Sequence, residues 1–128
     1  MTLRAIKTAG APSAIASYSQ AIDAGGFVFV AGQVGIDPAT GELVDGLVAQ
    51  AERALRNIVA ILDSAGLSMA DVVKTTCLLA DIDDFAAFNE IYARFIGDPP
   101  PARATYAVAA LPRGALIEIE AIAARSEG

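Results

Sequence analysis

Hydrophobic and polar residues alternate along this chain with two periods, one typical of strands and one typical of an amphipathic helix. From Gly46 to Ala65 apolar residues recur every three or four positions, and charged residues take the other faces, which predicts a helix. We expect Asp45 to cap its start and Gly66 to end it, because glycine tolerates the left-handed turn that ends helices. The apolar face of this helix is predicted to contain Leu47, Ala51, Ala54, Leu55, Ile58, Leu62 and Ala65.

Strand-like segments lie on both sides of this helix. Residues 3–8 and 19–34 predict the opening strands, and the second segment folds back at residues 23–26, where two glycines permit a tight hairpin turn. Residues 37–42 (DPATGE) predict the next turn. After the helix, residues 71–81 are rich in β-branched side chains and predict another strand.

The C-terminal third predicts a second helix and two final strands. The helix is expected to begin near Asp83 or Asp84 and to end at Gly97, before three prolines. Residues 104–111 and 115–124 predict two strands joined as a hairpin through residues 112–114. An aromatic stripe on the helix, which we interpret as core packing, contains Phe85, Phe88, Tyr92 and Phe95.

The predicted order is therefore β-β-β-α-β-α-β-β, an α+β fold in one domain spanning residues 1–128. Residues 27–34 are apolar at both alternating positions, with Phe27 and Phe29 on one face and Val28 and Val30 on the other. Two helices can cover only one face of such a sheet. A second copy of the chain is the simplest cover for the other face, so the pattern predicts a homo-oligomer.

Composition narrows the range of functions. Apolar residues make up 55% of the 128 residues, yet no apolar run reaches the roughly 18 needed to span a membrane. The first residues do not resemble a secretion signal, so we expect a cytoplasmic protein. One cysteine and no histidine leave no usual metal site and no His-based catalysis. A net charge of −6 with scattered cations disfavours nucleic acids and anionic membranes as partners.

Charged residues interrupt the last two predicted strands. Strand alternation places Glu118 and Glu120 on one face, and Arg103 lies on the preceding strand. These groups could form a solvated face or a structural ion pair. Alternatively, the arginine could hold a substrate carboxylate through two parallel hydrogen bonds while a glutamate orients or deprotonates water. The spacing alone favours neither interpretation.

Four long motifs carry a resemblance to a known family over essentially the whole chain. They read APSAIASYSQAI, FVFVAGQVGIDPATGEL, DVVKTTCLLADIDDFAAFNEIYARF and PPPARATYAVAALPRGALIEIEAIA, and together they resemble the YjgF/RidA family. The resemblance implies a chorismate-mutase-like fold assembled as a homotrimer, with a central barrel of sheets and ligand clefts between subunits. It also implies hydrolysis of reactive enamines and imines, such as 2-aminoacrylate and 2-iminobutanoate, to 2-keto acids and ammonia without a cofactor.

The resemblance also implies roles for particular residues. Arg103 matches the family's carboxylate clamp, and Glu118 matches the group that orients water. Tyr18 and Asn89 match residues that line the cleft. Gly32 matches a glycine where the backbone closely approaches the ligand. The implied substrate is a small molecule with a carboxylate.

Two positions in the expected substrate-binding set depart from the family pattern. Thr105 stands where members often have cysteine, and Ala31 stands where they often have serine. Ala16 and Ser17 replace the usual Gly-Pro before Tyr18. We expect these departures to affect substrate preference and the conformation of the Tyr18 loop rather than the reaction class.

The remaining polar groups and the alternative functions complete the interpretation. We interpret Glu120 as structural and Cys77 as a packed thiol, because free cysteine is among the most buried residue types. A non-catalytic metabolite-binding or chaperone-like protein on the same trimer is the alternative function. Ribonuclease or translation-inhibitor activity, attributed to some family members, is disfavoured by the negative charge and the missing histidine.

Overall fold

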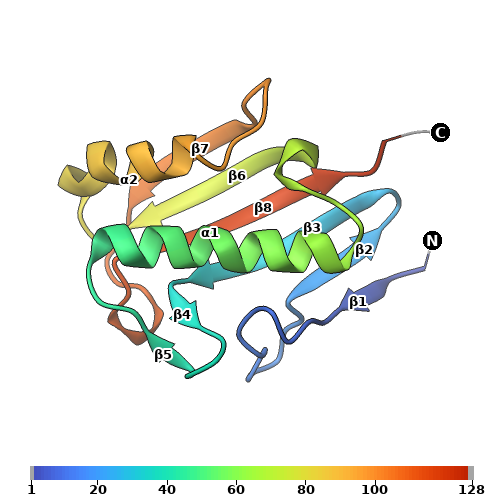
Figure 1. The fold of residues 1–128 in the computed structure, drawn as a ribbon, viewed down its shortest axis with the longest axis horizontal. Coiled ribbons are helices and arrows are strands. Elements are labelled where there is room, and N and C mark those ends of the chain that lie inside the picture. The colour runs from blue at the N-terminus through green and yellow to red at the C-terminus, as the bar shows by residue number, and fades with distance from the viewer. Residues whose placement is uncertain (1, 127–128) are drawn as a thin grey trace.

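The computed structural model describes residues 2–126 as a twisted six-stranded sheet with two helices on one side (Figure 1). A small separate hairpin of two strands precedes the first helix. No helix in this part of the chain is both long and apolar enough to cross a bilayer. The elements are β1 (Arg4–Ile6), β2 (Ala21–Ala24), β3 (Phe27–Val34), β4 (Ile36–Asp37), β5 (Glu42–Leu43), α1 (Leu47–Ser64), β6 (Val72–Leu79), α2 (Phe85–Ala93), β7 (Ala102–Ala107) and β8 (Ile117–Ala124).

The predicted mixed fold and element order are confirmed, apart from the β4–β5 hairpin, which forms around the turn predicted at residues 37–42. The β2–β3 hairpin turns at Gly25 and Gly26, whose φ angles of 59° and 86° are readily accessible to glycine. The main sheet has the strand order β1-β2-β3-β8-β6-β7.

The predicted hairpin between the last two strands is wrong. β8 lies between β3 and β6 and is antiparallel to both, whereas β7 pairs only with β6 and runs parallel to it. The parallel pair arises because α2 forms the crossover between β6 and β7. Residues 108–116 then carry the chain across the end of β6, so the last two strands are not neighbours.

Helix α1 buries an apolar stripe against β3 and β8. Its predicted cap is corrected from Asp45 to Gly46, which adopts φ 86° and makes no side-chain cap hydrogen bond. The predicted end of α1 at Gly66 is confirmed. Gly66, at φ 78°, lets its N–H donate to the Asp63 carbonyl and the Leu67 N–H donate to the Leu62 carbonyl, which is the Schellman arrangement.

Helix α2 is shorter than predicted because it ends at Ala93 rather than at Gly97. The N–H groups of Arg94 and Phe95 bond to carbonyls three residues back, which tightens the last turn and ends the helix. The aromatic stripe packs largely as predicted: Phe88 and Tyr92 are buried, and Phe85 and Phe95 are partly buried.

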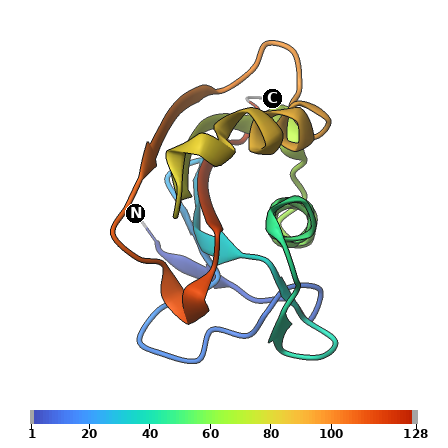
Figure 2. The ribbon, with the colours of Figure 1, turned by 90° about the vertical axis from the view of Figure 1, so that its left-hand side faces the viewer.

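One face of the sheet packs under the helices, and the other is uncovered in the single chain (Figure 2). Val28 and Val30 are buried on the helix side. Phe27, Phe29 and Tyr106 remain 44%, 45% and 52% exposed. The expectation that both faces are buried is therefore met on one face only, and cover for the other face stays a prediction.

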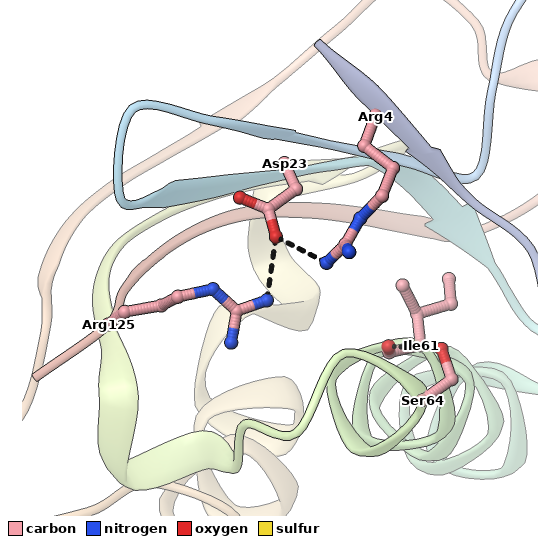
Figure 3. Close-up of polar contacts among 5 residues, drawn as sticks. All are labelled: Arg4, Asp23, Ile61, Ser64 and Arg125. Carbon is pink, nitrogen blue, oxygen red and sulfur yellow. Dashed lines mark hydrogen bonds and ion pairs between the residues drawn. The ribbon is translucent and has the colours of Figure 1, made fainter. Parts of the chain in front are cut away.

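Asp23 joins both ends of the chain at one edge of the fold. Its carboxylate accepts hydrogen bonds from Arg4 on β1 at 3.0 Å and from Arg125, just after β8, at 2.7 Å (Figure 3). The hydrogen bond from Arg125 is the main cause that lowers the pKa of Asp23, and the charges of both arginines add to it. The two contacts link residues of β1 and β2 with the residue that follows β8.

Candidate active site

Arg103 on β7 extends over helix α2. Its Nη1 donates to Asn89 Oδ1 at 2.7 Å. Its guanidinium carbon lies 4.7 Å from the ring centroid of Tyr92 and 5.2 Å from that of Phe85. Positions 85, 89 and 92 lie on one face of α2, because residues three and four apart are neighbours on a helix surface. One helix face thus orients the arginine.

A surface cavity of about 470 Å³ opens beside this arginine. Its walls come from the end of α2 and from the loop before β7, including Ile96, Pro100 and Pro101, with Asn89 and Arg103 as polar groups. Asn89 uses one edge of the guanidinium. A planar guanidinium carries five N–H donors in a fixed fork, so donors remain for a carboxylate.

Thr105 lies two residues along β7, on the same face as Arg103. Within residues 2–126, its Oγ1 is a buried side-chain oxygen without a hydrogen-bond partner. Its neighbour across the strand pair, Cys77, is fully buried, as the packing interpretation predicted. Burial raises the pKa of Cys77 to about 11, so little thiolate exists at neutral pH.

Glu118 lies on β8 and contacts the bulge of β3. The register of β3 against β8 shifts between Val30 and Gln33, so Gly32 stands at an irregular position. A Cβ at Gly32 would lie 2.9 Å from both Cδ and Oε2 of Glu118, so any side chain there would displace the carboxylate. Burial raises the pKa of Glu118, and the nearby charge of Glu120 raises it further.

Arg103 and Glu118 lie on opposite faces of the sheet. Arg103 is the register partner of Thr75, whose side chain is buried beneath α2. Glu118 is the register partner of Leu78, the residue after the buried Cys77. Because paired residues share a face and successive residues alternate, Glu118 points away from the helices. The chain presents these two groups as two candidate half-sites, one around Arg103 on the helix side and one around Glu118 on the open side, rather than as one joined pair.

Tyr18 belongs to neither half-site within the chain. It is 51% exposed, on the loop between β1 and β2, beside a cavity of about 390 Å³. The buried Gln20 organises this loop: its Oε1 accepts from the Thr8 N–H at 2.7 Å, and its Nε2 donates to the Pro12 carbonyl at 2.7 Å. Ala31 adjoins the loop, because its N–H donates to the Gln20 carbonyl at 2.9 Å.

The structure therefore sorts the predicted site residues into three groups. Arg103, Asn89 and Thr105 lie on the helix side, Glu118 and Gly32 lie on the open side, and Tyr18 and Ala31 lie at the loop.

Sequence reasoning missed the aromatic platform under Arg103, because the stripe of Phe85 and Tyr92 was assigned to the core alone. The signal was present: an asparagine matched to the family's cleft stands at position 89, within one turn of each aromatic residue.

Residues 2–126 hold no cluster of three or more His, Cys, Asp and Glu side chains able to bind a metal ion.

The sequence and the fold of this chain match one family of proteins. Residues 8–125 match the family described as Endoribonuclease L-PSP, and the chain belongs to this family, also called YjgF/RidA. The human 2-iminobutanoate/2-iminopropanoate deaminase is 53% identical over 121 residues, covering 94% of this chain and 88% of the human protein.

Solved structures agree with this assignment. RidA from the Antarctic bacterium Psychrobacter sp. PAMC 21119 superposes with a TM-score of 0.92 at 47% identity, covering 94% of this chain and 98% of that one. TdcF of E. coli, solved with bound serine, superposes with a TM-score of 0.92 at 41% identity, covering 96% of this chain and 99% of its own.

Proposed function

We propose that this protein hydrolyses 2-imino acids, and the 2-enamine acids that tautomerise to them, to 2-keto acids and ammonia. The observation that carries the proposal is the preorganised Arg103, held by Asn89 and two aromatic rings with guanidinium donors left over. Relatives named as 2-iminobutanoate/2-iminopropanoate deaminases, at 53% identity in the human protein, support the reaction class. The serine bound to TdcF supports a small ligand with a carboxylate.

The reaction site lies between two copies of the chain. Arg103 and Glu118 occupy opposite faces of one sheet, so one chain cannot bring them to the same small substrate. The exposed apolar face around Phe27 and Phe29 offers the contact surface for a second copy. A closed homotrimer, with its open sheet faces forming a central barrel, would repeat one such cleft at each of its interfaces.

In the proposed mechanism, Arg103 binds the carboxylate of the imine through two hydrogen bonds and fixes the position of C2. Glu118 of the neighbouring copy accepts a proton from water as the water oxygen bonds to C2 of the protonated imine and the C=N electron pair moves to nitrogen, which yields a neutral carbinolamine. Glu118 returns this proton to the nitrogen, and the C–N bond breaks to release ammonia. The hydroxyl proton passes to the Glu118 carboxylate as the C2 carbonyl of the keto acid forms, and ammonia carries this proton away as ammonium. Asn89, Thr105 and the Gly32 backbone line the cleft, with Tyr18 and Ala31 at its entrance.

The raised pKa of Glu118 suits this role. A carboxylate that is a stronger base than usual removes a proton from water more readily, and a positioned general base contributes roughly 10²- to 10⁴-fold. Imine hydrolysis is facile enough in water for such a contribution to suffice, so no step of the mechanism requires a cofactor.

The test generates 2-iminobutanoate from threonine with a threonine dehydratase and follows 2-ketobutanoate formation while semicarbazide competes for the imine. We expect the protein to accelerate hydrolysis and Arg103→Ala to reduce kcat/KM by about 100-fold, because two charge-assisted hydrogen bonds are lost. Arg94→Ala, which removes an exposed positive charge just after α2, is the matched control and should retain activity. An Arg103→Ala protein as fast as the parent would refute the assignment.

A second candidate is ligand binding without catalysis, which the serine bound to TdcF also favours. The two are separated by Glu118→Gln, which would abolish hydrolysis but leave the affinity for a small carboxylate ligand such as serine intact. A chaperone-like role on the same trimer would appear as binding of unfolded protein clients. The family's description as an endoribonuclease does not lead us to propose RNA cleavage, because the net charge is −6 and the sequence has no histidine.

A further inference from the structure

The Tyr92 ring that contacts Arg103 carries one of two buried hydroxyl groups that the mechanism above does not use. Thr75 Oγ1 and Tyr92 Oη are 2.6 Å apart, and the two residues are 1% and 5% exposed. We infer that this Thr75–Tyr92 pair is a positioning device that holds the Tyr92 ring under the guanidinium of Arg103 and so sets the affinity for the substrate carboxylate. The inference rests on the proposed function for its substrate.

Packing alone does not explain two hydroxyl groups at this place. Valine and phenylalanine would fill nearly the same volumes without buried oxygens, whereas an unpaired buried hydroxyl is destabilising. The two groups satisfy each other, and the Cys77 thiol, 3.9 Å from Thr75 Oγ1, is a weak further donor. Burial raises the pKa of Tyr92, so the pair remains a neutral hydrogen bond at physiological pH.

The pair connects back to the arginine by two routes. Through the backbone, Thr75 on β6 is the register partner of Arg103 on β7. Through the side chains, the Tyr92 ring centroid lies 4.7 Å from the guanidinium carbon. The pairing of β6 with β7, the hydrogen bond between Thr75 and Tyr92 and the cation–π contact of Tyr92 with Arg103 thus connect the three residues to one another. Together they fix the Tyr92 ring relative to the Arg103 backbone.

Asn89 and Phe85 also contact the guanidinium, but both lie on α2 alone. The hydrogen bond between the hydroxyl groups of Tyr92 and Thr75 is the contact that ties this helix face to the strand beside Arg103. Without it the ring can rotate or shift, and the guanidinium loses a fixed plane. Since bidentate recognition of a carboxylate depends on that plane, substrate binding should weaken.

The predicted kinetic signature is a change in KM rather than in kcat. The carboxylate is bound in the ground state and in the transition state alike, so a loosened clamp removes binding common to both. A purely structural role would instead lower the amount of active protein and leave KM unchanged.

The experiment compares Thr75→Val, Tyr92→Phe and Thr75→Ser in the full-length protein, with Thr76→Val as the control. Thr76 is the next residue on β6 and points to the opposite face. For 2-iminobutanoate we expect KM to rise about fivefold in Thr75→Val and in Tyr92→Phe, as for the loss of one hydrogen bond, with kcat within about twofold. The double variant should resemble each single one, and Thr75→Ser should restore the parental KM.

A second readout needs no turnover. The ¹⁵N relaxation of the Arg103 Nε–Hε group, identified by its loss in Arg103→Ala, reports the rigidity of the ligand-free clamp. Its order parameter should fall in Thr75→Val and Tyr92→Phe and should stay at the parental value in Thr75→Ser and Thr76→Val. An unchanged order parameter together with an unchanged KM in the first two variants would overturn the inference.

The two readouts keep the two proposals apart. If the parent protein fails to hydrolyse imines, the proposed function falls, but the order parameter still tests whether the hydroxyl pair holds Arg103. If Thr75→Val does not fold, Tyr92→Phe keeps the ring and removes only the hydroxyl, so it carries the test alone.

Discussion

At the scale of single residues, Glu118 shows how neighbours set the chemistry of a carboxylate. Ile117 and Ile119, on either side of it, are fully buried under the helices, while its own side chain is half-buried against the β3 bulge. Partial removal of water raises its pKa, and Glu120 on the same face adds like-charge repulsion. The absence of a side chain at Gly32 makes this position available to the carboxylate.

The pH dependence of hydrolysis should follow from this. The proposed base must be deprotonated, so kcat/KM should fall as the pH drops through the raised pKa of Glu118. Glu120→Gln removes the repulsion and should move this acid limb to lower pH, whereas Lys74→Gln, a change on the neighbouring strand that does not remove a negative charge, should not lower it. If the low-pH fall of kcat/KM does not move in Glu120→Gln, this fall reports the titration of a group other than Glu118.

The stability contributed by Glu118 changes with pH in the direction opposite to that of most carboxylates. Because the folded state holds the Glu118 proton more tightly than the unfolded chain does, the contribution of this group to stability is fully present below its unfolded pKa. It is lost as the pH rises through the raised folded value. The expected activity and this part of the stability therefore change in opposite directions with pH.

At the scale of elements, the course of the chain into β6 depends on how α1 ends. The Schellman turn at Gly66 redirects the chain from α1 toward β6, which is the strand that pairs with both β7 and β8. Its φ of 78° lies where a Cβ is sterically strained. Space is available there, because a Cβ at this position would lie 4.0 Å from its nearest neighbour, Arg125 Nη1.

Replacing this glycine should therefore expose the cost of the backbone alone. We expect Gly66→Ala to lower the free energy of unfolding by about 1 kcal/mol, measured by urea denaturation, through left-handed strain. Gly66→Asn is the matched control and should lose less, because asparagine visits this conformation more readily. Equal losses in the two variants would show that something other than backbone conformation decides the stability at this position.

At the scale of the whole molecule, the open sheet face is the main unexplained surface of the single chain. Phe27, Phe29 and Tyr106 are large apolar side chains that remain about half exposed on it. Exposed apolar patches of this kind mark interaction sites. A trimer that buries this face would also bring the two half-sites of neighbouring chains together, so one arrangement would meet both requirements.

Subunit mixing tests this arrangement directly. Arg103→Ala and Glu118→Gln chains with different tags are coexpressed, and assemblies carrying both tags are purified. In a closed ring of three, one interface in each mixed trimer pairs an intact Arg103 with an intact Glu118, so about one-third of the parental activity should return. Each variant purified alone is the control and should be nearly inactive.

A lack of recovery in verified mixed assemblies would contradict the inter-chain cleft. Sedimentation velocity of the parent protein supplies the companion measurement. A species of three chains is expected, and a monomer at all concentrations would remove the basis for the shared site.

The sequence by itself determined the features that depend on local periodicity. The apolar stripe of α1, the glycine turn before β3 and the alternation that separates Glu118 from Ile117 and Ile119 were all readable, because a helix or a strand repeats its environment at a fixed spacing. The motifs also identified the family and a set of candidate residues.

Only the tertiary structure decided how these parts meet. The insertion of β8 between β3 and β6 depends on long-range burial and on a crossover that no local pattern encodes. With this strand order Arg103 contacts α2 and Glu118 lies on the opposite face of the sheet. The two residues that were expected to form a pair therefore form two candidate half-sites. A side chain's face follows from its own strand, but its neighbours follow from which strands pair, and pairing is a property of the whole fold.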